Sequence, residues 1–377
     1  MLTTTFDDAL DFLRSHVDVA VLEHGAARVA VVPAYQGRVM TSTAGSGGGP
    51  SFGWINRPVI ASGVHQPHIN VYGGEDRFWL GPEGGQYSIY FPPGAPFEFE
   101  HWQTPALIDT EPFAVTRRTP TEVAFEREAR LVNYSGFAFD LGIRRTVRIL
   151  DADSLDAIPA NLKRDDLGLV AFESENTITN LGPQAWRHDT GLLSIWILGM
   201  YPPSPRATLI LPCQCAEGSE LPPPINDRYF GKVPAERLTF AQGAYLFKGD
   251  GAHRAKVGLA PAQARPRIGS YDPDNRVLTL VEYNQPVGSS RYVNSMWEHQ
   301  DHPYAGDVVN AYNDGPPAPG QPPLGPFYEL ETSSPAADLA PGESLTHIHR
   351  TIHVSADGAA LAVIGSHALG VSLKSLE

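Results

Sequence analysis

TEVAFEREARLV (residues 121–132) and FAFDLGIRRTVRIL (residues 137–150) form the stretch that decides the fold class. Both segments are rich in β-branched and aromatic residues, and the short link Asn133–Gly136 between them is typical of a turn. The pattern predicts two long strands that pair with each other. Strands of this length must bury one face, which two stacked antiparallel sheets accomplish.

Shorter strand-like segments continue on both sides of this pair. Gly25 and Ala26 separate two of them as a hairpin turn. Three Pro-rich stretches, at 202–205, 221–224 and 316–326, are expected to be loops because strand patterning resumes after each. The further strand segments are 19–24, 27–33, 37–44, 169–182, 191–201, 276–284, 325–332, 344–356 and 359–366.

Two short segments have helical patterns. Near the N-terminus, apolar residues recur at helical spacing from Phe6 to Leu13, and Thr5 can cap this helix. A second helix is expected at 234–239. The sequence therefore predicts an all-β protein, a large twisted antiparallel β-sandwich, with a short N-terminal helix within residues 1–17. We expect the chain to form one domain over residues 1–377.

The chain is acidic and globular in composition. Of its 377 residues, 28 are Lys or Arg and 42 are Asp or Glu, which gives a net charge of −14. Such a surface repels phosphate backbones and anionic lipids, so nucleic acid and membrane surfaces are not expected as partners. No apolar run approaches the ~20 residues of a membrane helix, and the N-terminus lacks a leader pattern. We expect a cytoplasmic monomer or homodimer, or a periplasmic protein if a leader was removed.

Cys213 and Cys215 are the two cysteines of the chain. One intervening residue is tight for a disulfide, and a metal site needs further ligands from elsewhere. Two ordinary thiols are therefore expected.

Residues 63–91, GVHQPHINVYGGEDRFWLGPEGGQYSIYF, form the densest polar and aromatic cluster of the sequence. Sugars need aromatic platforms for their C–H faces and planar polar groups for their hydroxyls. The segment therefore predicts a carbohydrate-binding loop. The alternative is a structural loop that Arg77 staples through ion pairs, with Trp79 in the core. The candidate substrate-binding residues here are His65, Asn70, Glu75, Asp76, Arg77, Trp79 and Glu83.

Residues 291–316, RYVNSMWEHQDHPYAGDVVNAYNDGP, form a second polar cluster. From it we take Asn294, Trp297 and Asn313 as candidate substrate-binding residues. His-x-x-His occurs in both clusters, and four histidines from two loops could bind a divalent metal ion. They could equally line a sugar pocket, or the second segment could be a surface loop of turn-forming residues. The candidate metal ligands are His65, His68, His299 and His302, of which His68 and His299 are also candidate catalytic residues.

The third cluster lies on two strands near the C-terminus. Phe327, Glu329 and Glu331 fall on one face of their strand because side chains alternate between faces. In THIHRTIH, His347, His349, Thr351 and His353 likewise share a face. This His-lined face is a site if it is concave, and a solvated face if it is open to bulk water. Glu329 and Glu331 are candidate catalytic residues, and His349 is a candidate substrate-binding residue.

With these clusters in view, the chain resembles the galactose mutarotase-like (aldose 1-epimerase-like) superfamily. Three features carry the resemblance: NTITNLGPQAW (176–186), the Gly73-Gly74 turn followed by Trp79, and the run from Glu331 through Pro335 and Leu339 to Pro341-Gly342-Glu343. The sequence is similar above all to an uncharacterised bacterial branch with segments like GGEDRFWLGPEGGQ, NDGP and FYELE. The resemblance implies a β-supersandwich and carbohydrate chemistry. It also implies that Glu331 is the base that takes the anomeric proton, with Glu329 beside it.

One departure from the superfamily pattern concerns the acid. Mutarotases carry a general-acid histidine on the strand after the TNL-type turn, where this chain has Ser194 and Trp196, with His188 just ahead of the strand. Only half of the acid–base pair is therefore in its expected place. We expect an epimerase-like enzyme in which Glu331 or Glu329 is the base and a histidine is the acid, a reaction that needs no cofactor. One alternative is a carbohydrate lyase or hydrolase on the same fold, in which a divalent metal could assist the reaction. Two further alternatives are a non-catalytic sugar-binding protein and a purely structural protein.

Overall fold

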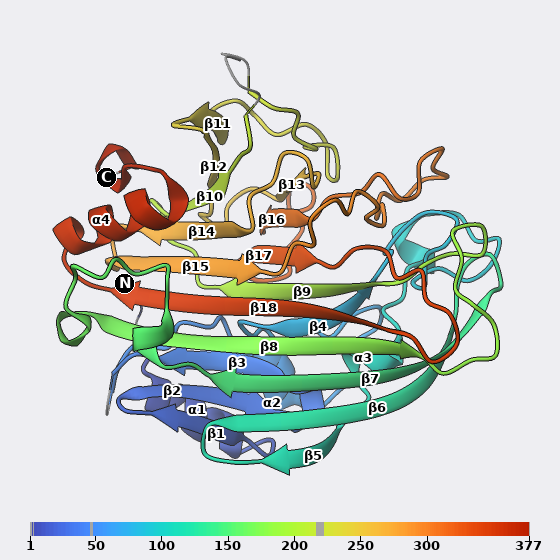
Figure 1. Cartoon of the computed structure of the whole chain (residues 1–377), viewed down its shortest axis with the longest axis horizontal. Coiled ribbons are helices and arrows are strands. Elements are labelled where there is room, and N and C mark those ends of the chain that lie inside the picture. Colours follow the sequence, from blue (N-terminus) through green and yellow to red (C-terminus); the bar gives the residue numbers. More distant parts are fainter. Residues whose placement is uncertain (1, 3, 46–47, 216–221, 377) are drawn as a thin grey trace.

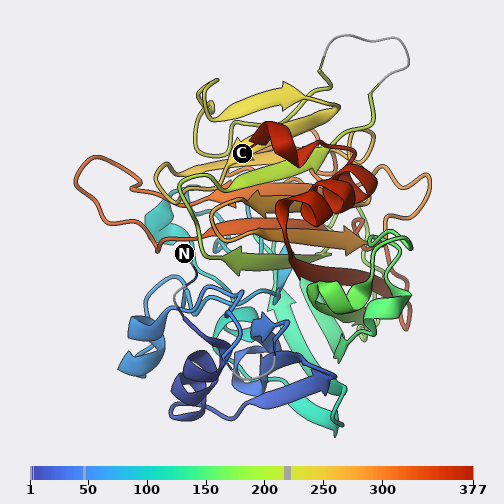
Figure 2. The ribbon, with the colours of Figure 1, turned by 90° about the vertical axis from the view of Figure 1, so that its left-hand side faces the viewer.

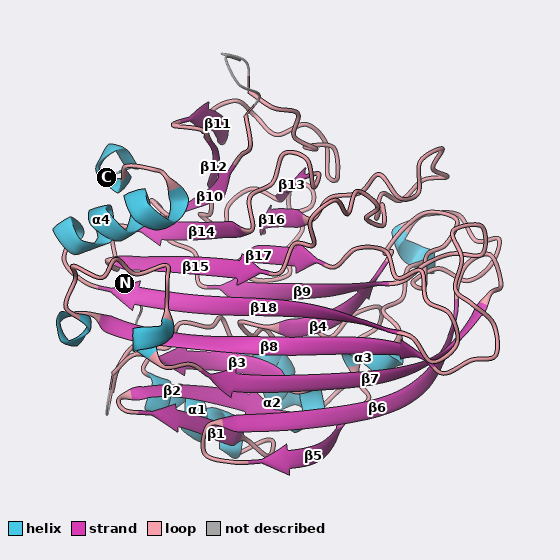
Figure 3. Cartoon of the chain, viewed as in Figure 1, coloured by secondary structure: helices cyan, strands magenta, loops and turns pink. Residues whose placement is uncertain are grey.

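Three antiparallel sheets make up the protein, in a computed structural model that describes residues 2, 4–45, 48–215 and 222–376 (Figures 1 and 3). The largest sheet has the strand order β11-β12-β10-β14-β15-β18-β8-β7-β6-β5. Its strands are β5 (Ala114–Arg118), β6 (Glu122–Val132), β7 (Ala138–Ile149), β8 (Gly168–Asn180), β10 (Thr208–Pro212), β11 (Leu238–Ala241), β12 (Ala244–Lys248), β14 (Arg267–Asp272), β15 (Val277–Tyr283) and β18 (Ser344–Ser355).

Two smaller sheets pack on one face of this large sheet. One has the order β13-β16-β17-β9-β4 and the other the order β1-β2-β3. Seen from the side, β1–β3 lie near one end of the molecule and β11 and β12 near the other (Figure 2). The strands are β13 (Ala255–Leu259), β16 (Val309–Asn313), β17 (Tyr328–Ser333), β9 (Ser194–Tyr201), β4 (Arg77–Gly81), β1 (Ala20–His24), β2 (Ala27–Val32) and β3 (Arg38–Thr43).

Helices are few and short. The N-terminal helix is α1, in which the Thr5 side chain accepts a hydrogen bond from the Asp8 N–H, as the sequence predicts. Among the described residues, no helix is both long and apolar enough to cross a bilayer. The helices are α1 (Phe6–Arg14), α2 (Arg57–Ser62), α3 (Ala106–Asp109) and α4 (Gly358–Leu369), with single 3₁₀ turns at Pro33–Tyr35, Phe99–His101, Ala152–Ser154, Arg164–Asp166 and Leu373–Leu376.

The predicted all-β sandwich is confirmed, including the long pair β6–β7 and the hairpin β1–β2. Two segment predictions are wrong. Residues 359–366 belong to α4, which Asp357 caps at its start and whose apolar residues cover the outer face of the large sheet. The predicted helix at 234–239 is a turn from Pro234 to Arg237 that leads into β11, because Leu238 pairs with Phe247 of β12. Cys213 and Cys215 are free thiols, as expected.

Polar side chains form a buried layer between the large sheet and the smaller sheets. His347 and His349 of β18 both contact the hydroxyl oxygen of Thr332 of β17, at 2.8 and 2.9 Å. Nearby, His353 contacts Glu75 at 2.8 Å, and both side chains are buried. The His-lined face of β18 is therefore neither a concave site nor a solvated face, because it is sealed inside the sandwich.

Seven charged residues of alternating sign cross the outer face of the large sheet in a line, one on each of seven neighbouring strands. Each acidic member uses both of its oxygens. Glu173, for example, accepts from Arg148 at 3.0 Å and from Arg350 at 2.7 Å. We call this row the ion ladder. Its members, in strand order, are Arg117, Glu122, Arg148, Glu173, Arg350, Glu282 and Arg267.

Candidate functional site

The candidate site lies on the face of the five-stranded sheet that points away from the large sheet. Thr332 of β17 faces the large sheet, so its neighbour Glu331 faces the other way. Strand pairing then decides which side chains join Glu331. Leu198 and Asn310 lie directly opposite it on the two adjacent strands, and Arg77 lies opposite Leu198. One polar face therefore collects residues from five strands.

Two buried ion pairs occupy this face. Lys256 donates a hydrogen bond to Glu331 Oε2 at 2.8 Å, and the Trp196 indole donates to the same oxygen at 2.9 Å. Arg77 donates to Glu329 at 3.1 Å and lies 4.0 Å above the ring of Trp79. Among the described residues, the second oxygen of Glu331, Oε1, is buried without a hydrogen-bond partner. A buried polar atom of this kind calls for a ligand or a water molecule.

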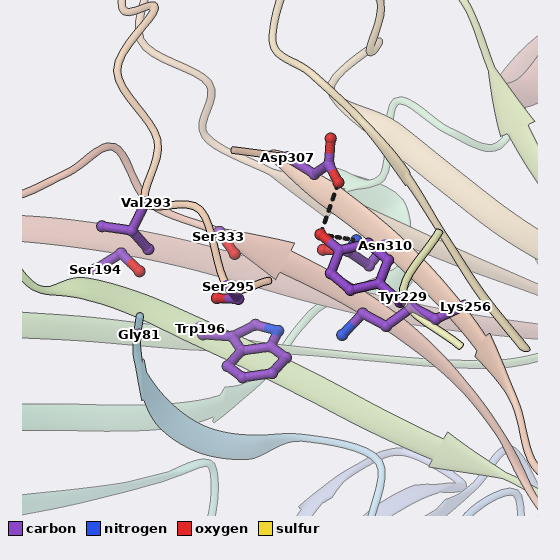
Figure 4. Close-up of a pocket in the computed structure, with 10 residues that line it drawn as sticks. All are labelled: Gly81, Ser194, Trp196, Tyr229, Lys256, Val293, Ser295, Asp307, Asn310 and Ser333. Carbon is purple, nitrogen blue, oxygen red and sulfur yellow. Dashed lines mark hydrogen bonds between the residues drawn. The ribbon is translucent and has the colours of Figure 1, made fainter. Parts of the chain in front are cut away.

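A small, narrow cavity of about 10 Å³ lies beside these pairs (Figure 4). Asp307 stands at one side, where it accepts hydrogen bonds from the Tyr229 hydroxyl at 2.7 Å and from Asn226 at 3.0 Å. Glu331 does not line the cavity, but it accepts hydrogen bonds from two residues that do, Lys256 and Trp196. The cavity is lined by Gly81, Ser194, Trp196, Tyr229, Lys256, Val293, Ser295, Asp307, Asn310 and Ser333.

Burial changes the acidity of three carboxyl groups around the cavity. It raises the pKa of Glu329 to about 8, an effect that Arg77 opposes and the charge of Glu331 reinforces. Burial also raises the pKa of Glu83, against the attraction of Lys256. The pKa of Asp307 is raised by burial as well, against the hydrogen bond from Tyr229. A carboxyl group with a pKa of about 8, such as that of Glu329, holds a proton near neutral pH and can give it to a ligand.

With this geometry in place, the comparisons with known proteins define the family. A family of unknown function, DUF6786, matches residues 4–377. The chain belongs to the DUF6786 family. No curated protein sequence matches this DUF6786 chain.

Solved structures show what fold the DUF6786 chain shares. A candidate aldose 1-epimerase of Escherichia coli K12 aligns over 90% of this chain and 99% of its own, with 14% identity and a TM-score of 0.53. The Slr1438 protein of Synechocystis sp. PCC 6803 aligns over 90% and 96%, with 14% identity and a TM-score of 0.50. A galactose mutarotase-like protein of Lactobacillus casei ATCC 334 aligns over 89% and 100%, with 11% identity and a TM-score of 0.48. The alignment with the Escherichia coli structure confirms the predicted aldose 1-epimerase-like (galactose mutarotase-like) fold.

The structure gathers some of the candidate site residues of this DUF6786 protein on the site face. Glu329, Glu331, Arg77 and Trp79 lie there on β17 and β4. Glu83 follows β4 and lies near Lys256 and Glu331, whose charges act on it, while Trp297 donates a hydrogen bond to it.

Other candidates lie between the sheets, away from the cavity. Glu75 accepts hydrogen bonds from the backbone and side chain of Ser42 and contacts His353. Asp76 forms a buried ion pair with Arg145 of the large sheet at 2.6 Å. His349 is enclosed by Thr332 and Thr351. These three residues join sheets to one another and do not line the cavity.

The three candidate asparagines form hydrogen bonds within the protein that hold neighbouring segments in place. Asn70 binds Asp109 through its side chain at 2.7 Å. Asn313 lies on the inner face of β16, where it accepts from the Gly251 N–H at 2.8 Å. Asn294 accepts from the N–H of Met296 at 3.0 Å. None of the three lines the cavity.

The histidines of the two His-x-x-His pairs lie on outer loops. His68 contacts the Trp102 backbone oxygen and the ring of Phe99, and His299 contacts the ring of Phe97. His65 and His302 are exposed. Within the described ranges, no three His, Cys, Asp or Glu side chains are grouped so that they could hold a metal ion.

The residues that line the cavity beside Glu331 are not among the site residues predicted from the sequence. Lys256 comes from a short strand and Tyr229 from a loop, and neither stands in a polar cluster of the sequence. Asp307 and Asn310 stand within the second cluster, but nothing in the sequence distinguishes them from their polar neighbours. Only the pairing β13-β16-β17 brings these residues to Glu331.

Proposed function

We propose that this protein is a carbohydrate-active enzyme that interconverts the anomers of a sugar, with Glu331 as general base. One observation carries the proposal. Glu331 is buried beside the cavity, with one oxygen held by Lys256 and Trp196 and the other without a partner among the described residues. A carboxylate oriented in this way has one oxygen available to accept the proton of an anomeric hydroxyl.

The surroundings of Glu331 suit a sugar. Trp196 and Trp79 meet edge to face at 5.4 Å and provide apolar surfaces for the C–H face of a ring. Serine hydroxyls and the amide of Asn310 line the cavity and can bind sugar hydroxyls. Ser194 Oγ is buried without a partner among the described residues, which makes it a further contact for a ligand hydroxyl.

The reaction requires one proton to leave O1 and another to reach the ring oxygen. Ring opening then frees C1 to close again on its other face, which inverts the anomeric centre. All of this is acid–base chemistry, so no cofactor is needed. We expect treatment with EDTA to leave the exchange rate unchanged.

Anomer exchange measured by two-dimensional exchange NMR on D-glucose, D-galactose, D-xylose and L-arabinose tests the proposal. We expect Glu331→Gln to reduce the exchange rate about 100-fold or more, the usual size of a general-base contribution. Glu236→Gln, which changes an exposed glutamate in the same way, is the matched control. Unchanged exchange in Glu331→Gln contradicts the assignment of the base.

A second candidate function is sugar binding without turnover. It is favoured by the absence, within the described residues, of any histidine hydrogen-bonded or ion-paired to Glu329 or Glu331. Saturation-transfer NMR detects binding without chemistry. Binding that Trp79→Ala abolishes, together with no anomer exchange, supports this candidate over the enzyme.

A further inference from the structure

We infer that Lys256 is the acid that protonates the ring oxygen, in place of the histidine that the superfamily pattern leads one to expect. This inference rests on the proposed epimerase function and adds a residue to it. The starting observation is that the cavity is lined by three titratable side chains, Lys256, Tyr229 and Asp307.

The hydrogen bonds of these three groups show which of them has a proton free to give to a ligand. The Tyr229 hydroxyl proton is already donated to Asp307, and Asp307 accepts from Asn226 as well. Lys256 has three protons, and among the described residues Glu331 is its only hydrogen-bond acceptor. The rings of Trp196 and Tyr229, at 4.5 and 5.3 Å from Nζ, hold the cation without accepting its protons in conventional hydrogen bonds. Lys256 therefore has protons available at the cavity.

The position of Lys256 relative to Glu331 matches the geometry of the reaction. O1 and the ring oxygen of a sugar are bonded to the same carbon, so the base and the acid must stand side by side. Lys256 Nζ lies 2.8 Å from Glu331 Oε2, which places the two groups next to each other on adjacent parts of one face. Glu329, by comparison, is held by Arg77.

The proton transfers balance. Glu331 takes the proton of the anomeric hydroxyl, and the electron pair of that O–H bond forms the C1=O1 double bond. The bond between C1 and the ring oxygen breaks, its electron pair stays on the ring oxygen, and the Lys256 ammonium supplies a proton there. After rotation about C1–C2, ring closure reverses each step and returns the proton to Lys256.

Lysine and histidine acids differ in the pH range over which they hold their proton. An ordinary histidine loses its proton above pH ~6.5, whereas an ordinary lysine keeps it to pH ~10. Lys256→His is expected to retain weak activity with the alkaline limb of the profile moved towards neutral pH.

The decisive variant is Lys256→Arg. A guanidinium keeps the charge and the contact with Glu331 but does not give up its proton in a protein. We expect kcat for anomer exchange to fall about 100-fold with KM changed by less than about threefold, because a general acid contributes roughly 10²–10⁴-fold. Lys248→Arg, on the exposed side of β12, is the matched control and is expected to behave as wild type.

Three outcomes separate the inference from the function on which it rests. If wild type exchanges anomers and Lys256→Arg does so equally well, the assignment of Lys256 is wrong and the function stands. If Glu83→Gln or Glu329→Gln removes kcat while Lys256→Arg keeps it, the acid is one of those carboxyl groups. If wild type exchanges no anomers of the four sugars, the proposed function fails and the assignment of Lys256 fails with it.

Discussion

At the scale of single residues, Thr332 links two buried histidines through one hydroxyl group. That hydroxyl can donate to one ring and accept from the other. If Thr332 accepts from His347 Nε2, it donates to His349 Nδ1, and His349 Nε2 faces Thr351 at 3.4 Å. His347 Nδ1, which has no partner among the described residues, is then an unprotonated acceptor. This arrangement is the less costly one, since a buried N–H without an acceptor is worse than a lone pair without a donor.

The burial of these two histidines predicts that the folded protein becomes less stable as the pH falls. Burial lowers the pKa of His347 to about 3 and that of His349 to about 4. Because unfolded histidine has a pKa near ~6.5, the unfolded chain binds more protons from about pH 4 to pH 6.5, and the free energy of unfolding falls as the pH falls through this window. Each histidine contributes a slope of up to about 1.4 kcal/mol per pH unit. Urea unfolding from pH 4.5 to 7.5 should show a shallower slope in His347→Gln/His349→Gln, and an unaltered slope contradicts the explanation.

At the scale of strands and helices, the ion pairs of the ion ladder help to fix the register in which the strands of the large sheet pair. From Glu122 to Arg267, each member lies directly opposite the next on the neighbouring strand. A slip of one residue in any strand turns its charged residue to the other face, which is the sandwich interior. The ladder therefore disfavours wrong registers as well as stabilising the right one.

Charge reversal within the ladder is expected to destabilise the protein. Glu173→Lys places three cations in a row with Arg148 and Arg350 and replaces two attractive contacts by two repulsive ones. We expect a loss of about 1–3 kcal/mol in the free energy of unfolding, because each cross-strand charge pair is worth roughly 0.2–1 kcal/mol. Glu175→Lys, which loses one contact at a more exposed position, should lose less. If the loss in Glu173→Lys is the same in 20 mM and 1 M NaCl, electrostatics is not its cause.

The strands were largely predictable from the sequence, and α4 shows why one element was not. GAALAVIGSHAL is apolar on nearly every side, so it lacks the polar stripe that marks a surface helix. Its helical state depends on Asp357 at its start, Gly370 at its end and a sheet surface to pack on. The candidate site was predictable only in part for a related reason. The strand bearing Glu329 and Glu331 can be recognised from its alternating pattern, but the partner Lys256 lies 75 residues away and reaches Glu331 only through strand pairing.

At the scale of the whole molecule, Arg145 connects all three sheets. From β7 of the large sheet, it binds Asp76 just ahead of β4 and the Gly37 backbone oxygen just ahead of β3. Arg145 and Asp76 are both fully buried. Sequence patterns in loop 73–76 indicated a ligand site, but the same acidic residues are needed to neutralise charge inside the sandwich.

Removal of one partner of this ion pair is expected to destabilise the folded protein strongly. Asp76→Ala leaves the Arg145 charge buried and uncompensated, which typically costs 3–5 kcal/mol. The exposed pair of Arg130 and Asp140 is the control, and Asp140→Ala should cost less than about 1 kcal/mol. Urea unfolding monitored by tryptophan fluorescence measures both variants. Losses of similar size in the two variants contradict this account of Asp76.

The ion ladder also has a consequence for the history of the family. Within the row, each member forms ion pairs only with its immediate neighbours, although Glu173 and Arg350 are 177 positions apart along the chain. A mutation that inverts one charge is expected to be less damaging when the adjacent member of the row changes as well. Across DUF6786 sequences, we therefore expect correlated substitution at these seven positions, strongest between adjacent rungs and weaker with each strand crossed, so that an alignment alone should recover the order of the strands.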